Sequence, residues 1–250
     1  MTADRMDRES HILAQLADLG SLSVTSLASD LGVSEVTIRG DLKSLEQQGR
    51  LTRVRGGARP LTHQAILQRQ LLNAEAKDRI AAAAAAMVLD DDTVMIEAGT
   101  TAAAIGRYLG SRRGVQVVTN SNLVFENARA HPSLTVIVSG GVFRRESESF
   151  VGPVAERAIG DFNTRIAFLG TDGFSIERGL TTRFVEGAQV AALMSQRAEE
   201  TWLVADAAKF GSAGFVSFLP LSGITGLITD STLPADAVAE LSEHVEVRVV

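Results

Sequence analysis

Residues 34–58 are "SEVTIRGDLKSLEQQGRLTRVRGGA", and this stretch decides how the N-terminal part of the chain is interpreted. Ser34 can cap a helix, apolar residues then recur at helical spacing, and Gly49 can end the helix. Arginines next alternate with apolar residues up to a Gly-Gly pair, which is typical of a β-hairpin. The stretch therefore predicts a helix and a hairpin. The expected inward face of the helix consists of Val36, Ile38, Leu42 and Leu45.

Two more helices are predicted upstream of this stretch. The first has its apolar face at Ile12, Leu13, Leu16 and Leu19. The second is capped by Ser23 and has Leu27, Ala28 and Leu31 facing inward. Only the short turn at 32–34 separates it from the following helix, so the two form a helix-turn-helix. In such a unit the second helix lies in the major groove of DNA, with its N-terminal residues at the base edges.

Charge is distributed unevenly along the 250 residues, whose formal net charge is -6. Residues 39–59 hold six Arg and Lys against two Asp and Glu, a local +4 (6 minus 2) that indicates a polyanion partner. Hydroxyl, carboxylate and guanidinium groups suit base edges, and the hairpin arginines suit phosphates. A three-helix protein–protein module with a solvated charged face is the alternative. The residues predicted to bind DNA are Ser34, Glu35, Thr37, Arg39, Lys43, Arg53 and Arg55.

The stretch from Leu27 to Ala58 resembles the winged helix-turn-helix of the DeoR family of bacterial transcription regulators. The resemblance covers roughly residues 5–59 and implies a domain at 1–59 that binds a double-stranded DNA operator. One position departs from the family pattern, because a second Arg usually follows Arg39 and this chain has Gly40. We expect the fold to be kept and the operator affinity to be weaker or altered.

The remaining residues are predicted to form a linker at 60–74 and a second domain at 75–250. Helical stretches there alternate with short Val- and Ile-rich runs, which indicates a doubly wound α/β domain with a mostly parallel sheet. The apolar run at 80–89 is too short and too rich in Ala to span a membrane, so it is expected to be a packed helix. The predicted strands lie within 93–99, 115–121, 134–141, 165–173, 201–209, 223–230 and 245–250.

Polar and glycine residues follow four of these strands, as "EAGTT" at 97–101, "TNS" at 119–121, "SGG" at 139–141 and "GTDG" at 170–173. Ligands of doubly wound sheets bind at the carboxyl ends of the strands. Backbone amides, hydroxyls and Lys209 suit a phosphate, whereas Asp172 and Glu186 suit sugar hydroxyls. Each motif alone is more typical of a turn followed by a helix cap, and it is their shared edge that indicates a site.

Residues 75–250 are also similar to the C-terminal sensor domain of the DeoR family. That domain resembles sugar-phosphate isomerases and deaminases of the ribose-5-phosphate isomerase type, so the resemblance implies a small phosphorylated sugar as effector. The residue before Ala-Gly-Thr-Thr is usually Asp and is Glu97 here, so the size of the ligand is expected to differ. The effector-binding residues expected are Glu97, Gly99, Thr100, Thr101, Thr119, Asn120, Ser121, Gly140, Gly141, Asp172, Thr181, Glu186 and Lys209.

A sugar-phosphate isomerase or deaminase fused to a DNA-binding domain is the rival interpretation. Isomerisation needs a general base near the sugar C2 and a group that stabilises the enediolate, and Glu186 and Asp172 could formally serve. The related isomerases have a Lys-Gly-rich segment after their Asp motif, whereas residues 174–184 here contain no Lys. The active-site His of the deaminases also has no counterpart nearby. We therefore expect no enzymatic activity.

No cofactor and no metal site are expected either. The chain has no Cys, and His11, His63, His131 and His244 are scattered without ligand spacing. The first ten residues lack the apolar region of a signal peptide. The sequence thus predicts a cytoplasmic DNA-binding regulator that acts as a homodimer or homotetramer. The resemblance to the DeoR family implies that it is a repressor of carbohydrate-metabolism genes. Relief of repression by the effector is the expected sense, with strengthened DNA binding as the alternative.

Overall fold

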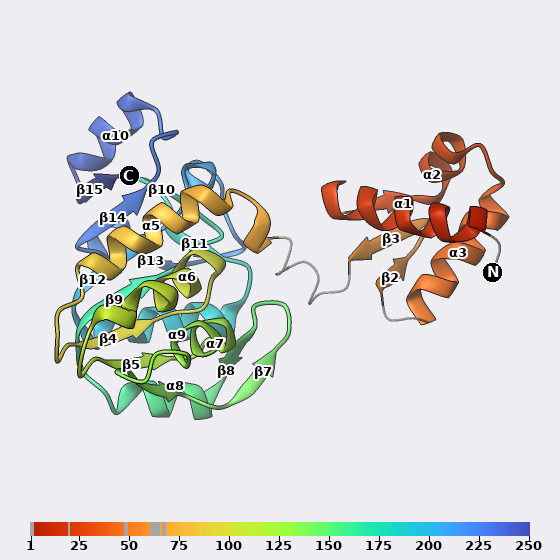
Figure 1. Ribbon diagram of the computed structural model, residues 1–250. Coiled ribbons are helices and arrows are strands. Elements are labelled where there is room, and N and C mark those ends of the chain that lie inside the picture. The colour runs from red at the N-terminus through yellow and green to blue at the C-terminus, as the bar shows by residue number, and fades with distance from the viewer. Residues whose placement is uncertain (1–2, 20, 48–49, 61–65, 67–68) are drawn as a thin grey trace. The chain divides into compact units, whose positions relative to one another are not determined.

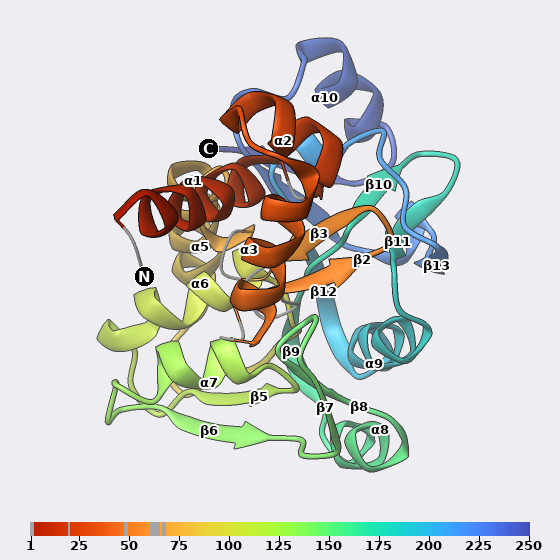
Figure 2. The same ribbon diagram turned by 90° about the vertical axis from the view of Figure 1, so that its right-hand side faces the viewer.

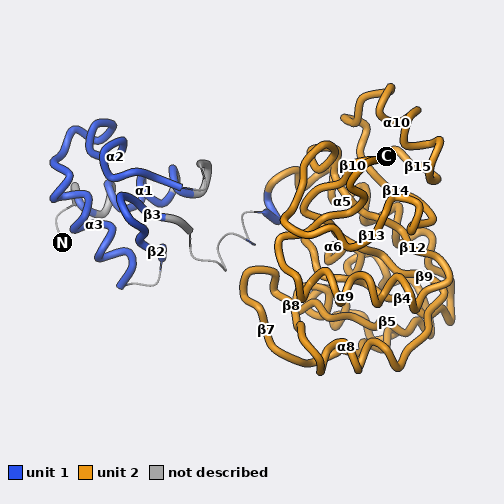
Figure 3. Tube along the Cα trace, turned by 180° about the vertical axis from the view of Figure 1, so that it is seen from behind, with its two compact units in different colours: residues 1–71 blue, residues 72–250 orange. Residues whose placement is uncertain are grey.

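The computed structural model consists of two compact units, residues 1–71 and residues 72–250 (Figure 3). The structure describes the whole chain except residues 1–2, 20, 48–49, 61–65 and 67–68. Residues 61–65 and 67–68 of the predicted linker, which include His63, therefore lie outside the described residues, as does Gly49. The two units are described separately.

In the described part of the N-terminal unit, the helices α1, α2 and α3 pack with a small sheet (Figure 1). The sheet has the order β1-β3-β2, and both of its strand pairs are antiparallel. The predicted helix-turn-helix and hairpin are confirmed, whereas the pairing of β1 with β3 was not predicted. The elements are α1 (Ala3–Leu19), β1 (Leu22–Ser23), α2 (Val24–Leu31), α3 (Glu35–Gln47), β2 (Leu51–Val54) and β3 (Gly57–Pro60).

The apolar faces of the three helices pack on one another and on the sheet. Ser23 caps α2 by accepting a hydrogen bond from the Ser26 N–H, and Gly32 ends the helix in the left-handed conformation. Buried Asp41 of α3 accepts two hydrogen bonds from Arg8 of α1, at 2.5 and 3.1 Å. The buried core residues are Ile12, Leu16, Leu22, Val24, Leu27, Ile38, Leu42, Leu45, Leu51 and Ala58.

The prediction that Val36 belongs to the inward face of α3 is wrong. Val36 is 76% exposed, whereas Ile38, Leu42 and Leu45 are buried as predicted. Successive residues of an α-helix are about 100° apart, so Val36 and Ile38 are separated by about 200° and cannot share a face. The outward side of α3 therefore carries an apolar side chain near its N-terminus.

The C-terminal unit is built on a seven-stranded sheet with the order β15-β14-β12-β9-β4-β5-β6. Every neighbouring pair in it is parallel. All seven strands overlap the predicted segments, although β9 begins one residue and β12 three residues before its segment, so the fold class is confirmed. From β4 the chain proceeds outward through β5 and β6, then returns to β9 on the other side of β4. The strands are β4 (Thr93–Ile96), β5 (Gln116–Thr119), β6 (Thr135–Val138), β9 (Thr164–Leu169), β12 (Ala198–Val204), β14 (Gly226–Thr229) and β15 (Glu246–Val249).

Helices cover both faces of this sheet (Figure 2). On one face α5 (Ala74–Ala86) packs on α6 (Thr100–Tyr108), and α6 packs on α7 (Asn122–Ala128). On the other face α8 (Pro153–Gly160) packs on α9 (Val185–Gln196). The helix α10 (Ala235–Ser242) lies beside β15. The sequence pattern predicts a helix over 185–200, but α9 ends at Gln196, because the chain turns at Arg197 and β12 begins at Ala198.

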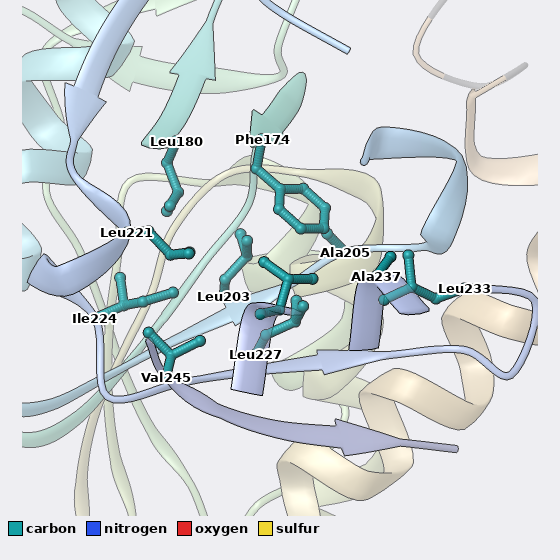
Figure 4. Close-up of a cluster of buried hydrophobic side chains, with 11 residues drawn as sticks. Phe174, Leu180, Leu203, Ala205, Leu221, Ile224, Leu227, Leu233, Ala237 and Val245 are labelled. Carbon is teal, nitrogen blue, oxygen red and sulfur yellow. The ribbon is translucent and has the colours of Figure 1, made fainter. Parts of the chain in front are cut away.

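Aliphatic side chains fill the interior of the unit, as expected for a chain with 5% aromatic residues. The aromatic side chains of Phe168 and Trp202 are buried among them. Alanines of α5 and α6 are buried where the two helices meet, and their small side chains permit close approach. The cluster shown in Figure 4 consists of Phe174, Leu180, Leu203, Ala205, Leu221, Ile224, Leu227, Leu233, Ala237, Leu241 and Val245.

Two small antiparallel sheets stand beside the central sheet and were not predicted. One is the hairpin of β7 (Val142–Arg144) and β8 (Ser149–Val151). The other has the order β10-β11-β13 and consists of β10 (Gly173–Ser175), β11 (Gly179–Thr182) and β13 (Val216–Leu219). Short 3-10 turns lie at Leu109–Ser111, Ala207–Lys209 and Leu221–Gly223. No helix in the described part of the chain is long and apolar enough to cross a membrane.

Candidate DNA interface and effector site

The outward side of α3 carries Val36, Arg39, Gly40 and Lys43, all of them exposed. These positions are spaced by three, four and seven residues from Val36, so they form one stripe along the helix. Two of the four are cations, and none of the four belongs to the core of the unit. The stripe is therefore the part of α3 that is open to a partner.

The remaining predicted residues of the helix start interact with one another. The Ser34 hydroxyl caps α3 by accepting a hydrogen bond from the Thr37 N–H at 3.1 Å, and it lies 2.9 Å from the Thr37 hydroxyl. The Glu35 carboxylate accepts hydrogen bonds from Thr25 at 3.0 Å and from Arg39 at 2.7 Å. Glu35 thus ties the start of α3 to α2 and orients Arg39.

Arg53 and Arg55 lie on the β2–β3 hairpin, and both are exposed. The backbone N–H of Arg53 donates a hydrogen bond to Glu46 of α3 at 3.0 Å, which ties the hairpin to the helix. Arg55 stands in the turn, directly before Gly56, whose φ is +81°. The hairpin thus presents two guanidinium groups beside α3, as a DNA-binding wing does.

In the C-terminal unit, the carboxyl ends of β4 and β9 meet where the strand order reverses. Glu97 directly follows β4 and is buried. Its Oε2 accepts a hydrogen bond from the Gly170 N–H, directly after β9, at 3.4 Å. Burial, together with the nearby negative charge of Asp172, raises the pKa of Glu97 to about 8 against the hydrogen bonds donated to it. The centre of this edge therefore holds a neutral carboxylic acid at neutral pH.

Gly99 turns the chain from β4 into α6. Its φ of +154° is one that side-chain-bearing residues rarely adopt, and a Cβ there would lie 3.7 Å from the Cα of Gly170. The first hydrogen bond of α6 is donated by Ala103 to Gly99, so the N–H groups of Thr100 and Thr101 are not used within the helix. The helix start therefore offers amide donors beside Glu97.

Three polar residues at the carboxyl end of β5 are fully buried and hold the neighbouring loops of the sheet edge together. They are Thr119, Asn120 and Ser121. The Thr119 hydroxyl donates to the Ile96 carbonyl at 2.6 Å. The Asn120 side chain accepts from the Ala98 N–H at 3.2 Å and donates to the Phe150 carbonyl at 3.3 Å. Ser121 caps α7. The geometry gives all three a supporting role for the loop at 97–101, and contact with an effector remains a prediction.

The glycine pair after β6 differs in its surroundings. Gly140 has φ +64°, and a Cβ added there would meet nothing within 4 Å. Gly141 has φ +114°, and a Cβ there would lie 2.8 Å from the Val151 carbonyl oxygen and 3.1 Å from the Ala155 Cβ. Gly141 thus allows β8 and α8 to approach, whereas Gly140 borders open space.

Asp172 and Thr181 lie where β9 passes into the β10–β11 hairpin. Oδ2 of Asp172 accepts hydrogen bonds from the Thr182 hydroxyl at 3.1 Å and from the Arg183 N–H at 2.9 Å. Thr181 is buried, and its hydroxyl donates to the Gly173 carbonyl and accepts from the Gly214 N–H, both at 2.7 Å. Thr181 therefore supports the hairpin, and Asp172 stands half-buried at its base.

Glu186, at the start of α9, pairs with an arginine that the sequence did not single out. Arg144 of β7 donates a hydrogen bond to Glu186 at 2.7 Å, and its guanidinium lies 4.5 Å from the centre of the Phe184 ring. The pair joins the β7–β8 hairpin to α9. No sequence signal marks Arg144, because its partner is 42 residues away.

Lys209 ends the 3-10 turn that follows β12. The next residue, Phe210, forms a bridge with Phe174, and the Gly211 N–H donates to the Phe174 carbonyl at 2.9 Å. These contacts bring the Lys209 segment against the chain that follows Asp172. Among the described residues, the Lys209 ammonium has no ion-pair partner. Asp206 before it is buried and accepts a hydrogen bond from Asn73 at 3.0 Å.

The described residues contain no cluster of His, Cys, Asp or Glu that could hold a metal ion. A winged helix-turn-helix with a basic outward stripe, followed by a doubly wound unit with a polar edge, defines a DNA-binding regulator with a sensor domain. The model of the DeoR-like helix-turn-helix domain matches residues 8–64, and that of the DeoR C terminal sensor domain matches residues 72–231. The chain belongs to the DeoR family of transcriptional regulators, as its sequence predicted.

Curated relatives match almost the whole chain. The HTH-type transcriptional regulator GlpR of Haloferax volcanii is 36% identical over 248 residues, which cover 98% of this chain and 96% of the relative. The putative aga operon transcriptional repressor of Escherichia coli O157:H7 is 31% identical and covers 98% and 93%. The HTH-type transcriptional repressor CsqR of Escherichia coli K12 is 30% identical and covers 94% and 92%. These names and the two family models bear out a regulator rather than an enzyme.

Among solved structures, ribose 5-phosphate isomerase A of Methanocaldococcus jannaschii is 19% identical with a TM-score of 0.41, over 55% of each chain. Ribose 5-phosphate isomerase of Plasmodium falciparum is 16% identical with a TM-score of 0.39, over 56% of this chain and 54% of that one. Sequence identities and TM-scores this low support no conclusion about activity. The fold assignment depends on the strand order and on the family models.

Proposed function

We propose that this chain represses carbohydrate-metabolism genes and that a phosphorylated sugar, bound in the C-terminal unit, controls its affinity for the operator. The observation that carries the proposal is the polar edge at the point where the strand order reverses, between Glu97 and Gly170. Two of the relatives are named as repressors, which supports the direction of control.

The phosphate is assigned to the start of α6. The amides of Thr100 and Thr101 point outward from the helix start, and the helix dipole favours an anion there. Lys209 supplies a cation from the segment packed against the chain after Asp172. A neutral Glu97 places no negative charge beside the phosphate and can donate a hydrogen bond to one of its oxygens.

The sugar hydroxyls are assigned to the carboxylates. Asp172 accepts hydrogen bonds at Oδ2 from the Thr182 hydroxyl and the Arg183 N–H. Glu186 is partly exposed and is oriented by Arg144. Carboxylates accept hydrogen bonds from several hydroxyls at once, which suits a polyol. Gly140 borders open space and leaves room for a ligand close to the backbone.

DNA binding is assigned to α3 and to the β2–β3 wing. We infer that Arg39 contacts a base edge or phosphate and that Lys43, Arg53 and Arg55 contact phosphates. Ser34, Glu35 and Thr37 hold the helix start in shape. One winged helix covers a single half-site, so the working form is proposed to be a homodimer or homotetramer in the cytoplasm, where its operator is.

Thermal melting of the full chain against sugar phosphates and their unphosphorylated parents tests the proposal. A ligand at about 100 times its dissociation constant adds about 2.7 kcal/mol, a shift of several degrees. The shift is expected with one sugar phosphate and is expected to disappear in Asp172→Ala and Lys209→Ala. Arg157→Ala, on the exposed side of α8, is the matched control and should keep the shift. No shift with any sugar phosphate would contradict the proposed effector.

A further inference from the structure

Val36 is an exposed aliphatic residue at the second position of α3, with 76% of its surface open. A single exposed apolar side chain on a protein surface is ordinary. The surroundings of Val36 make it informative, because its neighbours along the stripe are Arg39, which is 58% exposed, and Lys43. An apolar side chain followed along the same stripe by two cations fits a polyanion that also presents a methyl group.

We propose that Val36 reads a thymine of the operator through the 5-methyl group that thymine exposes in the major groove. The proposal rests on the proposed placement of α3 in that groove. Each base pair presents a distinct pattern there, and thymine is the only base with a methyl group, which apolar side chains contact. Arg39 of the same stripe can fork onto the O6 and N7 atoms of a guanine.

The spacing of the stripe sets where the two bases lie. Val36 and Arg39 are three residues apart, about 4.5 Å along the helix at about 1.5 Å per residue. Bases follow one another at about 3.4 Å along a strand. The thymine read by Val36 and the guanine read by Arg39 therefore lie in neighbouring base pairs.

The other polar groups at the helix start are already engaged. Both oxygens of Glu35 accept hydrogen bonds, from Thr25 and Arg39. The Ser34 hydroxyl caps the helix and lies within hydrogen-bond distance of the Thr37 hydroxyl. Val36 thus remains the unengaged side chain of the first turn that points outward.

Gly40 leaves space for the methyl group. It lies four residues after Val36 on the same stripe, and a Cβ added there would meet nothing within 4 Å. Val36 and the side-chain-free position Gly40 therefore form a small apolar surface beside Arg39.

Deoxyuridine, which is thymine without its methyl group, tests the inference directly. Duplexes would be selected from a randomised pool by the full chain, and each thymine would then be replaced singly by deoxyuridine. Wild-type protein should lose about fourfold in affinity at one thymine of each half-site, the effect of one buried methyl group. Val36→Ser should bind the parent duplex as weakly as wild type binds the deoxyuridine duplex, and should not distinguish the two.

Val154→Ser is the matched control, because Val154 is likewise the second residue of a helix, α8, and is 52% exposed. This variant should keep the wild-type sensitivity to deoxyuridine. Equal affinity of wild type for every duplex, or unchanged sensitivity in Val36→Ser, would overturn the inference. Arg39→Ala and Lys43→Ala distinguish an error in the role of Val36 from an error in the placement of α3 in the major groove. If both weaken binding while the deoxyuridine series is flat, only the role of Val36 is wrong. If neither weakens binding, the placement of α3 is wrong as well.

Discussion

Oε2 of Glu97, at the end of β4, lies 3.4 Å from the backbone nitrogen of Gly170, at the end of β9. This hydrogen bond joins the two strands at the point where the order of the sheet reverses. Burial of the carboxyl group and the neighbouring Asp172 raise its pKa to about 8. The centre of the proposed effector site is therefore sensitive to pH in the neutral to mildly alkaline range.

Glu97→Gln is expected to remove a pH dependence of stability. The unfolded chain releases the Glu97 proton near its ordinary pKa of 4.5, whereas the folded chain keeps it up to about pH 8. Between these values the folded state binds more protons, so the free energy of unfolding contributed by Glu97 falls as pH rises, by a few kcal/mol at most. Urea unfolding at pH 5, 6.5 and 8, followed by the fluorescence of the single tryptophan, Trp202, measures this slope.

Glu156→Gln on α8 provides the control for that series, and it should keep the wild-type slope. Trp202 lies in β12, so its fluorescence follows the C-terminal unit rather than the DNA-binding unit. Identical slopes in wild type and Glu97→Gln would show that Glu97 is ionised in the folded protein.

The two glycines after β6 should respond differently to alanine. Gly140→Ala meets no neighbour, so it should cost only the strain of a left-handed φ, about 1 kcal/mol. Gly141→Ala adds a contact at 2.8 Å with the Val151 carbonyl oxygen to an unfavourable φ, and should cost about 1–3 kcal/mol more. Urea unfolding followed at Trp202 compares the pair. Equal losses would mean that β8 and α8 can shift away without cost.

Substitutions at Gly40 should separate helix stability from DNA contact. Gly40→Ala should stabilise α3 by about 0.5–1 kcal/mol, since the site is exposed and a Cβ meets nothing. Gly40→Arg adds a cation to the stripe and should tighten DNA binding beyond Gly40→Ala. Its salt dependence should steepen by about 0.9 in the log–log slope if one phosphate contact is gained. Affinities at two salt concentrations measure this, and equal affinity of the two variants would place position 40 away from DNA.

Glu35→Gln should lower the discrimination between DNA sequences. The Glu35 carboxylate accepts a hydrogen bond from Arg39 at 2.7 Å. The negative charge of Glu35 also repels DNA phosphates. Its loss should raise affinity for unrelated DNA and lower it for a selected duplex, because Arg39 is no longer oriented. The ratio of the two affinities is the readout. Glu46→Gln removes the same charge from the same helix and should raise affinity for both duplexes. A parallel rise for both duplexes in Glu35→Gln would exclude the orienting role.

The architecture of the sensor unit is largely predictable from its sequence. Most strands of the central sheet are short runs rich in Val, Ile and Leu, and such runs between helical segments are typical of parallel strands. The edge at Glu97 and Asp172 followed from the same pattern, because parallel strands place their carboxyl ends together.

Other features depend on contacts between distant residues, which spacing does not encode. The strands of β7–β8 and of β10–β11–β13 have the sequences VFR, SFV, GFS, GLTT and VSFL, and none of them is a Val- and Ile-rich run. The pair of Arg144 and Glu186 brings together distant segments. The burial of Glu97 follows from the packing of the loops after β4 and β9. Val36 was misplaced because an apolar residue was assumed to face the core.

Fluorescence anisotropy of a selected duplex, titrated with the full chain with and without the stabilising sugar phosphate, tests the central claim most directly. We expect the saturating sugar phosphate to weaken the affinity for the duplex at least about fivefold, within the usual range of coupling between sites. Lys209→Ala should bind the duplex normally and should not respond to the sugar phosphate. A sugar phosphate that raises the melting temperature of the protein but leaves its affinity for the duplex unchanged would contradict the claim.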